Sequence, residues 1–210
     1  MKLYNADLSP NCLRVRAVAA ELGIELDVVE VDIFRGGGSA AEFVAMNPNG
    51  KVPLLSDGDF ALWESRAIMN YLATQRPELD LYPSDAKRRA VVDQWSYWQA
   101  IHLGPAMQKV AFEKVLKPRF KMGDPDESVI AAQMKDVEKL LKVLDGALAN
   151  KDWVAGALSV ADFALASTFM YREAAEISLD DLASVEAWIE RVESRQSWKK
   201  AVAPLLAGMG

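Results

Sequence analysis

Residues 53–75 read PLLSDGDFALWESRAIMNYLATQ, and the pattern of this stretch decides the fold. Two short apolar runs, Pro53–Ser56 and Phe60–Leu62, are joined by Asp57-Gly58-Asp59, and an Asp-Gly step in this setting is typical of a β-hairpin. From Glu64 to Gln75 the apolar residues recur at helical spacing. The stretch therefore predicts two antiparallel strands followed directly by a helix.

The residues before the hairpin predict a strand–helix–strand unit. Residues 1–4 form a short strand candidate, and helical spacing over residues 15–22 ends at Gly23, a residue that commonly ends helices. Residues 26–31 alternate and are rich in β-branched side chains, as strands are. With a short helix over residues 39–46, the order is β-α-β-α-β-β-α. Its first two strands are expected to pair in parallel.

The rest of the chain predicts helices only. Residues 77–86 hold two prolines and little periodicity, which indicates a linker between a first domain, 1–76, and an all-helical domain, 87–210. A long helix is predicted from Lys87 to Leu116, bent at Gly104-Pro105. Further helices fit residues 130–148, 160–175, 182–195 and 197–206.

The composition excludes several classes of protein. The 210 residues carry a formal net charge of -6, whereas a nucleic-acid partner calls for the opposite sign. The single cysteine, Cys12, and the single histidine, His102, exclude an internal disulfide, a multi-thiolate zinc site and a His-His metal pair, so no metal site is predicted. No apolar run suggests a signal peptide or a membrane span, and we expect a cytoplasmic protein without a membrane partner.

The first candidate cluster is Ser9-Pro10-Asn11, where the first strand gives way to the first helix. Ser is a favoured N-cap and Pro a favoured first helical residue, so capping alone explains the run. The same helix N-terminus can stabilise a bound thiolate, to which the Ser9 hydroxyl and the Asn11 amide could donate. Cys12 follows inside the helix and is interpreted as a small core residue rather than a reactive thiol.

The second cluster, residues 47–55, reads NPNGKVPLL and leads into the hairpin. A turn-rich loop entering a strand at a proline explains this pattern structurally. Only a cis Val52-Pro53 bond would turn the Val52 backbone outward toward a peptide-like ligand, and periodicity gives no reason to expect one. The three glycines 36–38 upstream are interpreted as a mobile loop.

The third cluster, Trp63-Glu64-Ser65, opens the helix after the hairpin. An acid and a hydroxyl are reasonable capping residues in a first turn. In a functional reading, Glu64 receives an ammonium group while the Ser65 hydroxyl and N–H bind a carboxylate. That pair of groups matches the end of an α-amino acid.

The order and spacing of the three clusters, followed by an all-helical half, resemble the cytosolic glutathione S-transferase family over nearly the whole chain. The resemblance implies a thioredoxin-like first domain that binds glutathione and a helical domain that supplies most of the electrophile pocket. It implies that Ser9 holds and activates the glutathione sulfur, and that Val52 precedes a cis-proline, Pro53, and pairs with the cysteinyl part. Glu64 and Ser65 are similar to the γ-glutamyl binders. A detoxifying homodimer is expected from the resemblance alone.

Ser159-Val160-Ala161-Asp162-Phe163 is similar to the capping box and staple of the family's sixth helix, which makes Asp162 structural. The chain has no tyrosine at the tyrosine-type position. Its Ser9-Pro10-Asn11 run is closer to a bacterial subgroup with Ser or Thr before Pro-Asn, in which the Asn also approaches the sulfur. How Ser9 and Asn11 divide the work therefore stays open.

The expected mechanism needs no cofactor beyond glutathione as co-substrate. Lys51 is available to the second carboxylate of glutathione, and His102, Met107 and Phe112 are candidates for the electrophile pocket because the family uses that helix. The activated thiolate then attacks a small hydrophobic electrophile. Two alternatives stay open, a glutathione-dependent disulfide or peroxide reductase and a non-catalytic binding module. Retention of the clamp residues argues against the module.

Overall fold

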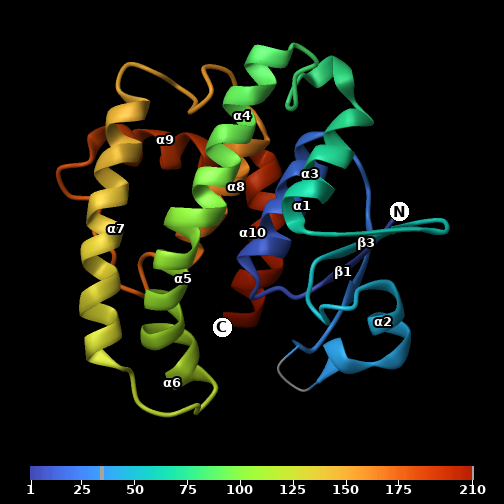
Figure 1. Ribbon diagram of the computed structural model, residues 1–210, viewed down its shortest axis with the longest axis horizontal. Coiled ribbons are helices and arrows are strands. Elements are labelled where there is room, and N and C mark those ends of the chain that lie inside the picture. Colours follow the sequence, from blue (N-terminus) through green and yellow to red (C-terminus); the bar gives the residue numbers. More distant parts are fainter. Residues whose placement is uncertain (34–35, 210) are drawn as a thin grey trace. The chain divides into compact units, whose positions relative to one another are not determined.

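The computed structural model describes residues 1–33 and 36–209, and its internal contacts group into two compact units (Figure 1). One unit holds Met1–Ser84 together with the segment that begins at Glu193, and the other holds Asp85–Val192. No helix among the described residues has the length and apolar character needed to cross a bilayer.

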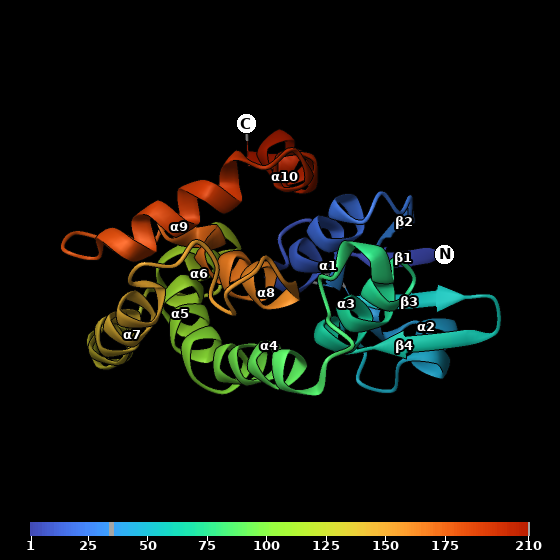
Figure 2. The ribbon, with the colours of Figure 1, turned by 90° about the horizontal axis from the view of Figure 1, so that it is seen from above.

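The first unit is built on a four-stranded mixed sheet in the order β2-β1-β3-β4 (Figure 2). Strands β1 (Lys2–Asn5) and β2 (Asp27–Glu30) pair in parallel, and β3 (Leu54–Asp57) pairs antiparallel with both β1 and β4 (Phe60–Trp63). Gly58 takes a φ of 60° between β3 and β4, which suits the tight turn that the Asp-Gly step predicts. The β-α-β-α-β-β-α order, and with it the thioredoxin-like fold, is confirmed.

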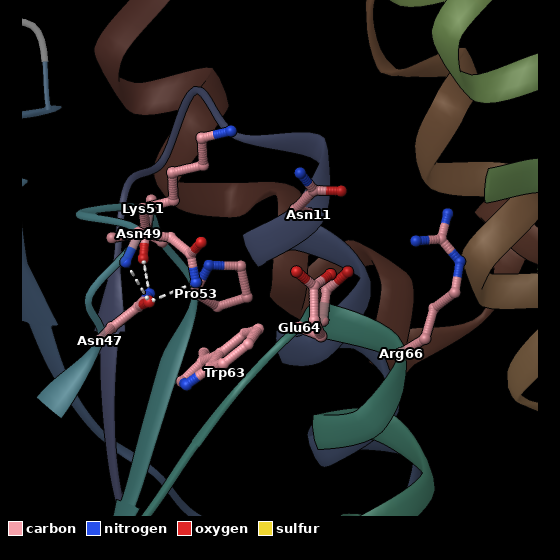
Figure 3. A pocket seen from close by; sticks show the side chains of 10 residues that line it. Asn11, Asn47, Asn49, Lys51, Pro53, Trp63, Glu64 and Arg66 are labelled. Carbon is pink, nitrogen blue, oxygen red and sulfur yellow. Dashed lines mark hydrogen bonds between the residues drawn. The ribbon is translucent and has the colours of Figure 1, made fainter. Parts of the chain in front are cut away.

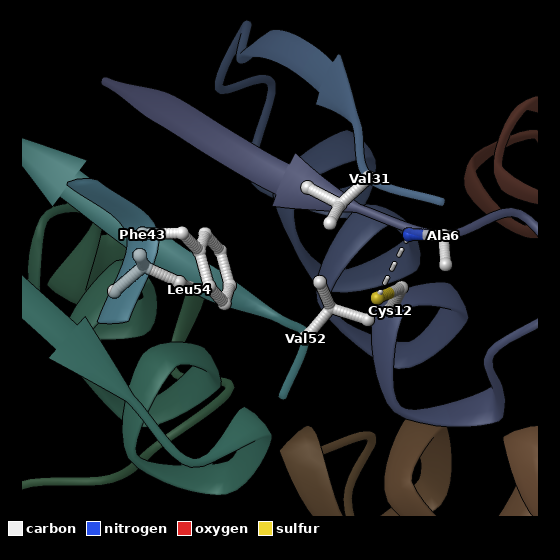
Figure 4. Close-up of a cluster of buried hydrophobic side chains, with 6 residues drawn as sticks. All are labelled: Ala6, Cys12, Val31, Phe43, Val52 and Leu54. Carbon is white, nitrogen blue, oxygen red and sulfur yellow. Dashed lines mark hydrogen bonds between the residues drawn. The ribbon is translucent and has the colours of Figure 1, made fainter. Parts of the chain in front are cut away.

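Helices cover the sheet on both faces. Helices α1 (Pro10–Glu21) and α3 (Ser65–Thr74) pack together, and α3 also packs on β3 and β4. On the face that carries Tyr4 and Leu54, the ring of Phe43 from α2 (Ala41–Met46) meets Tyr4 edge to face, with 5.7 Å between centroids. A buried cluster there joins Phe43 and Leu54 to Cys12 and Val52 (Figure 4), so the core lies directly beneath the loop that enters β3.

Two of the glycines before α2, Gly37 and Gly38, are closely packed. Gly37–Ser39 form a short 3-10 helix, and a Cβ on Gly38 would lie 2.2 Å from the carbonyl oxygen of Gly50. Only glycine permits this close approach at Gly38, whereas a Cβ on Gly36 would meet nothing within 4 Å. For Gly36–Gly38 the interpretation as a mobile loop stays a prediction. The contact fixes the loop around Gly50 against its neighbour.

The second unit begins with the predicted long helix, which contains two π-helical segments. It runs through α4 (Ala86–Trp98), a π segment (Gln99–Leu103), α5 (Gly104–Ala111), a second π segment (Phe112–Leu116) and α6 (Lys117–Arg119). Each π segment ends two residues before a proline, Pro105 or Pro118. Proline has no N–H to give to the carbonyl four residues earlier, and the wider π turns accommodate that loss.

The remaining helices follow the predicted periodicity closely. They are α7 (Glu127–Leu148), α8 (Val160–Ala166) with a 3-10 extension (Ser167–Tyr171), α9 (Ala183–Ser194) and α10 (Gln196–Met209). Helices α5 and α7 pack side by side (Figure 1). At the start of α8 the capping box of Ser159 and Asp162 is present as predicted, and the Asp162 carboxylate also accepts the Trp188 indole N–H at 3.0 Å.

Helix α10 packs on α1, so the contacts place it with the first unit, whereas the predicted division places it with the helical half. The Glu21 carboxylate of α1 accepts hydrogen bonds from the Arg195 guanidinium and the Ser197 hydroxyl. Arg16 donates from Nε to the Ala201 carbonyl oxygen at 3.2 Å. These polar contacts bridge more than 170 positions of sequence, which no local pattern reports.

Candidate functional site

A pocket of about 140 Å³ lies in the first unit, where the start of α1, the loop before β3, the end of β4 and the start of α3 meet (Figure 3). It brings together six of the seven residues predicted for the sulfur and glutathione sites, all except Ser9. Its lining consists of Asn11, Asn47, Asn49, Lys51, Val52, Pro53, Trp63, Glu64, Ser65 and Arg66. Asn47, Asn49 and Trp63 also line the pocket, although the sequence pattern predicts no binding role for them.

The N-terminus of α3 forms one side of this pocket. Ser65 is the first helical residue, and the first helical hydrogen bond runs from the Ile68 N–H to the Glu64 carbonyl oxygen at 3.0 Å. The first turn of a helix carries N–H groups that the helix itself does not bond, together with the positive end of its dipole. An anion is therefore favoured next to Ser65.

Glu64 occupies the capping position of α3 without capping it. Its side chain makes no hydrogen bond to the first turn, and its backbone has φ 72° and ψ 110°. A non-glycine residue in such a conformation costs about 1–3 kcal/mol, and this strain persists only where the surrounding structure enforces it. The exposed carboxylate faces the pocket (Figure 3) and puts a negative charge beside the helix N-terminus.

Two arginines add positive charge near Ser65. Arg14, only 2% exposed, donates from Nη1 to the Ser65 Oγ at 3.4 Å. Burial and the neighbouring charge of Arg66 lower the pKa of Arg14, and burial lowers the pKa of Arg66 against the opposing effect of Glu64. Because Ser65 Oγ accepts from Arg14, its own proton can be donated to a ligand.

Asn47 shapes the loop that leads into β3. Its side chain is buried, donates from Nδ2 to the Lys51 carbonyl oxygen at 2.6 Å and accepts the Asn49 N–H at 3.0 Å (Figure 3). Together with the Gly38–Gly50 contact, these bonds fix the backbone from which the exposed Lys51 ammonium projects. The loop is thus tied by hydrogen bonds where it lines the pocket.

The Val52–Pro53 peptide bond is cis, as the resemblance implies and as periodicity alone gave no reason to expect. Within the described part of the chain, the Val52 N–H has no hydrogen-bond partner. Val52 lines the pocket while its side chain joins the core cluster below. A backbone N–H without a partner is therefore available in the residue that lines the pocket just before β3.

Ser9 and Asn11 differ in their relation to the pocket. Ser9 is the N-cap of α1, where its Oγ accepts the Cys12 N–H at 3.4 Å, and it is not among the residues that line the pocket. Asn11 is a lining residue, and its amide lies at the edge nearest Glu64 (Figure 3).

The pocket thus offers one carboxylate, a helix N-terminus with a serine, a lysine and an unpartnered backbone N–H. Such a set suits a short peptide with one free α-amino acid end and a second carboxylate. No cluster of three or more His, Cys, Asp or Glu residues placed to hold a metal ion occurs in residues 1–33 and 36–209.

Comparison with known proteins agrees with this geometry. Residues 1–74 match the N-terminal domain of glutathione S-transferases, and residues 105–196 match the C-terminal domain of the same proteins. The chain belongs to the glutathione S-transferase family. It transfers glutathione to electrophiles, and glutathione is its co-substrate.

Relatives of this glutathione S-transferase align over nearly its full length. A probable glutathione S-transferase of rice, GSTF2, is 36% identical over 95% of this chain and 94% of its own. Glutathione S-transferase 3 of maize is 32% identical over 98% and 94% of the two chains. The structure of maize glutathione S-transferase I in complex with an atrazine glutathione conjugate has a TM-score of 0.88 at 30% identity and covers 96% of both chains.

The residues predicted for the electrophile pocket of this transferase lie in the second unit and are dispersed. His102 lines a cavity of about 360 Å³ with residues of α5 and α7, and Phe112 lines another of about 270 Å³. Met107 is 2% exposed and belongs to the hydrophobic core. His102 and Phe112 thus line different cavities, and Met107 lines neither of these two.

Proposed function

We propose that the pocket of the first unit holds glutathione by its γ-glutamyl end. The Glu64 carboxylate pairs with the α-ammonium group, and the α-carboxylate takes the Ser65 hydroxyl and the N-terminus of α3. The observation that carries this assignment is the juxtaposition of Glu64 and Ser65, in which a strained backbone holds a carboxylate beside a helix N-terminus. A ligand explains why an acidic side chain stands at the start of a helix without capping that helix.

The rest of the tripeptide follows the loop before β3. The Val52 N–H pairs with the cysteinyl carbonyl in the manner of a strand, and the Lys51 ammonium binds the glycyl carboxylate. Support comes from the unpartnered Val52 N–H and from the Asn47 bonds that hold the Lys51 backbone. Pro53 sits at the turn into β3 and shapes this edge.

Thiol activation rests on the start of α1. Ser9, with Asn11, donates hydrogen bonds to the glutathione sulfur and stabilises the thiolate next to the positive end of the helix. An ordinary thiol with a pKa of about 8.5 is only a few per cent ionised at neutral pH, so a lowered pKa raises the thiolate fraction more than tenfold. Asn11 lines the pocket and Ser9 does not, which supports a direct role for Asn11.

The chemical step forms one sulfur–carbon bond. The thiol proton leaves to solvent, and the thiolate electron pair attacks the electrophilic carbon. A leaving group then departs with its bonding electrons, or an added proton completes an addition. We propose that the electrophile contacts the helix that carries His102 and Phe112. The buried Met107 of the same helix supports this contact from the core side.

Ultraviolet titration of the bound thiolate tests this assignment. In Ser9→Ala and Asn11→Ala the pH at which bound glutathione ionises is expected to rise, and the larger rise identifies the main donor. Glu64→Gln is expected to weaken glutathione binding about tenfold, the value of one lost charge-assisted hydrogen bond, with the ionisation pH unchanged. Unchanged titrations in both α1 variants would remove these residues from thiol activation.

A glutathione-dependent disulfide or peroxide reductase is the second candidate. It is favoured by Asn11, which lies in the pocket and which the resemblance to the Ser/Thr-Pro-Asn subgroup places near the sulfur. Turnover of a disulfide or peroxide with a second glutathione, and little conjugation of aryl halides, would favour it. Failure of the protein to bind immobilised glutathione would instead favour the non-catalytic module.

We further propose a cytoplasmic, detoxifying homodimer whose sequence divides into domains at 1–76 and 87–210 with a linker at 77–86, although α10 at the end of the second range packs on α1 of the first. We assign the chain to the serine-type members of the family, in which a serine hydroxyl activates the sulfur, because Ser9 stands at the N-cap of α1. Membership of a bacterial Ser/Thr-Pro-Asn subgroup rests on the Ser9-Pro10-Asn11 run alone, since the relatives include plant and insect proteins. We propose neither nucleic acid nor membrane as a partner.

A further inference from the structure

The pocket proposed to hold glutathione is too small to enclose a whole tripeptide. Its volume is about 140 Å³, whereas pockets that bury most of a small-molecule ligand measure roughly 300–1,000 Å³. A pocket of this size encloses one amino-acid end group and leaves the rest of a tripeptide along its rim. The two ends of the ligand therefore meet different surroundings.

The start of α3 forms the buried end of the pocket. Ser65 is 4% exposed, and its hydroxyl oxygen accepts a hydrogen bond from Arg14, which is 2% exposed. Glu64 adds a carboxylate from a backbone whose φ of 72° is held by the surrounding structure. Electrostatic interactions are stronger where water is excluded. The ammonium and the α-carboxylate of a γ-glutamyl group are thus recognised by partners at a fixed separation.

The loop before β3 forms the open end of the pocket. Asn49 and Lys51 are both exposed, and within the described part of the chain the Lys51 ammonium has neither a hydrogen bond nor an ion pair. Its long flexible stem can carry the ammonium to carboxylates in different positions. An ion pair between exposed groups changes an affinity by about fivefold at most. The open end therefore discriminates weakly between different C-terminal residues of a ligand.

The Val52 N–H lies between the two ends and has no partner among the described residues. In the proposed complex it donates to an oxygen of the cysteinyl carboxyl group. That oxygen belongs to a peptide carbonyl in glutathione and to a free carboxylate in the dipeptide γ-glutamylcysteine. Because hydrogen bonds to a charged acceptor are roughly twice as strong as neutral ones, the dipeptide regains at Val52 part of what it loses at Lys51.

We infer that this transferase recognises the γ-glutamyl end of its thiol substrate and tolerates changes at the other end, an inference that rests on the proposed function. Its substrate class is then γ-glutamyl thiols, which include γ-glutamylcysteine and tripeptides with another small residue in place of glycine. The isomer with an α-glutamyl linkage is rejected although it has the same atoms and charges. Its α-carboxyl group is consumed in the peptide bond, so no carboxylate stands beside the ammonium to meet Ser65.

Calorimetric titration of the full chain with S-methyl peptides tests this inference, because S-methylation removes thiol ionisation from the comparison. The Kd of S-methyl-γ-glutamylcysteine is expected to lie within about fivefold of that of S-methylglutathione. The S-methyl derivative of α-glutamylcysteinylglycine is expected to bind about a hundredfold more weakly, because it loses two charge-assisted hydrogen bonds at the start of α3.

Variants of the two ends give a second readout. Lys51→Ala is expected to weaken binding of S-methylglutathione by about fivefold at most and to leave the dipeptide unaffected. Lys199→Ala, at an exposed position of α10 outside the pocket, is the matched control and should change neither Kd. Glu64→Gln is expected to weaken both ligands by the same factor of about ten.

Three results would overturn the inference while the proposed function stands. They are a loss beyond the expected range for the dipeptide, equal binding of the α-linked isomer, and a loss beyond that range for S-methylglutathione in Lys51→Ala. Each of them is measured against binding of S-methylglutathione to the wild-type chain. Absence of that binding would instead overturn the proposed function, and the inference with it.

Discussion

Arg14 and Ser65 are 51 residues apart in the sequence, yet the buried Arg14 guanidinium donates to the Ser65 hydroxyl oxygen at 3.4 Å. The bond joins the helix that presents Asn11 to the helix whose N-terminus receives the γ-glutamyl carboxylate in the proposed complex. Arg14 does not line the pocket. In the proposed complex it therefore acts on the ligand through Ser65, as a positioning residue.

Replacement of Arg14 by Met is therefore expected to weaken glutathione binding selectively. Loss of a charge-assisted hydrogen bond is worth about 1.5 kcal/mol, which corresponds to a rise of roughly tenfold in KM for glutathione. The KM for the electrophile and the ionisation pH of the bound thiol should change little. Steady-state kinetics with each substrate varied in turn measure the split, and Arg14→Lys should restore part of the affinity. A fall in kcat with an unchanged KM for glutathione would contradict this role.

Local patterns predicted the parts of the fold whose determinants lie close together in the sequence. The β3–β4 hairpin follows from the Asp-Gly turn, and Glu64 and Ser65 follow from the helix that starts directly after it. The Ser159–Asp162 capping box is likewise contained within four residues. In each case a few adjacent residues set both the backbone and the chemistry.

What the sequence did not predict depends on contacts between distant segments. The amphipathic pattern of α10 indicates that one face is buried, but it does not name α1 as the partner. Asn47 reads as a turn residue until its side chain is seen bonded to the Lys51 carbonyl. The close approach of Gly38 to Gly50 is equally invisible in a run of glycines.

Asp162 and Asp126 both serve helix starts, and Asp→Asn substitutions should separate their roles. The buried Asp162 carboxylate accepts N–H groups of Val154, Ser159 and Trp188 at 2.9–3.0 Å, so an Asn amide there would place donors against donors. Asp162→Asn is expected to lower the free energy of unfolding by about 3 kcal/mol or more.

Asp126→Asn provides the matched control at the exposed N-cap of α7. There only acceptors for the Ser128 and Val129 N–H groups are needed, and Asn caps as well as Asp. Urea unfolding of the two variants should show a large shift in midpoint for the first and almost none for the second. Equal shifts would refute the distinction.

The Glu21–Arg195 pair should make the attachment of α10 depend on pH. Burial raises the pKa of Glu21, but the hydrogen bonds from Arg195 and Ser197 outweigh it and lower the pKa overall. A carboxyl with a lowered pKa in the folded state contributes stability above its unfolded pKa of about 4.3, and this contribution disappears as the pH falls through the folded value.

Glu21→Gln is accordingly expected to lower the free energy of unfolding by about 1–2 kcal/mol at pH 7, after allowance for screening of a half-buried pair. Once the pH falls below the lowered pKa of the folded state, the variant and the wild type should converge, because the wild-type carboxyl is then protonated in the folded protein as well. Glu173→Gln, in the exposed pair with Arg172, is the control and should have no measurable effect. A difference that persists unchanged at low pH would contradict the assignment.

Cys12 should be unreactive in the folded protein although it stands three residues after Ser9. Burial raises the pKa of its thiol to about 11, against the effects of the Ala6 N–H, which donates to Sγ at 3.4 Å, and of Ser9. At pH 7 a thiol with this pKa is ionised in about one molecule in ten thousand, and only the thiolate reacts. Labelling by a disulfide reagent is therefore expected to be negligible in buffer and stoichiometric in urea, while Cys12→Ala keeps the activity and loses some stability. Two results would contradict this prediction: rapid stoichiometric labelling of the folded chain, and loss of activity in a folded Cys12→Ala protein. Either result would show that Cys12 takes part in the chemistry and does not serve only in the buried cluster that includes Val52.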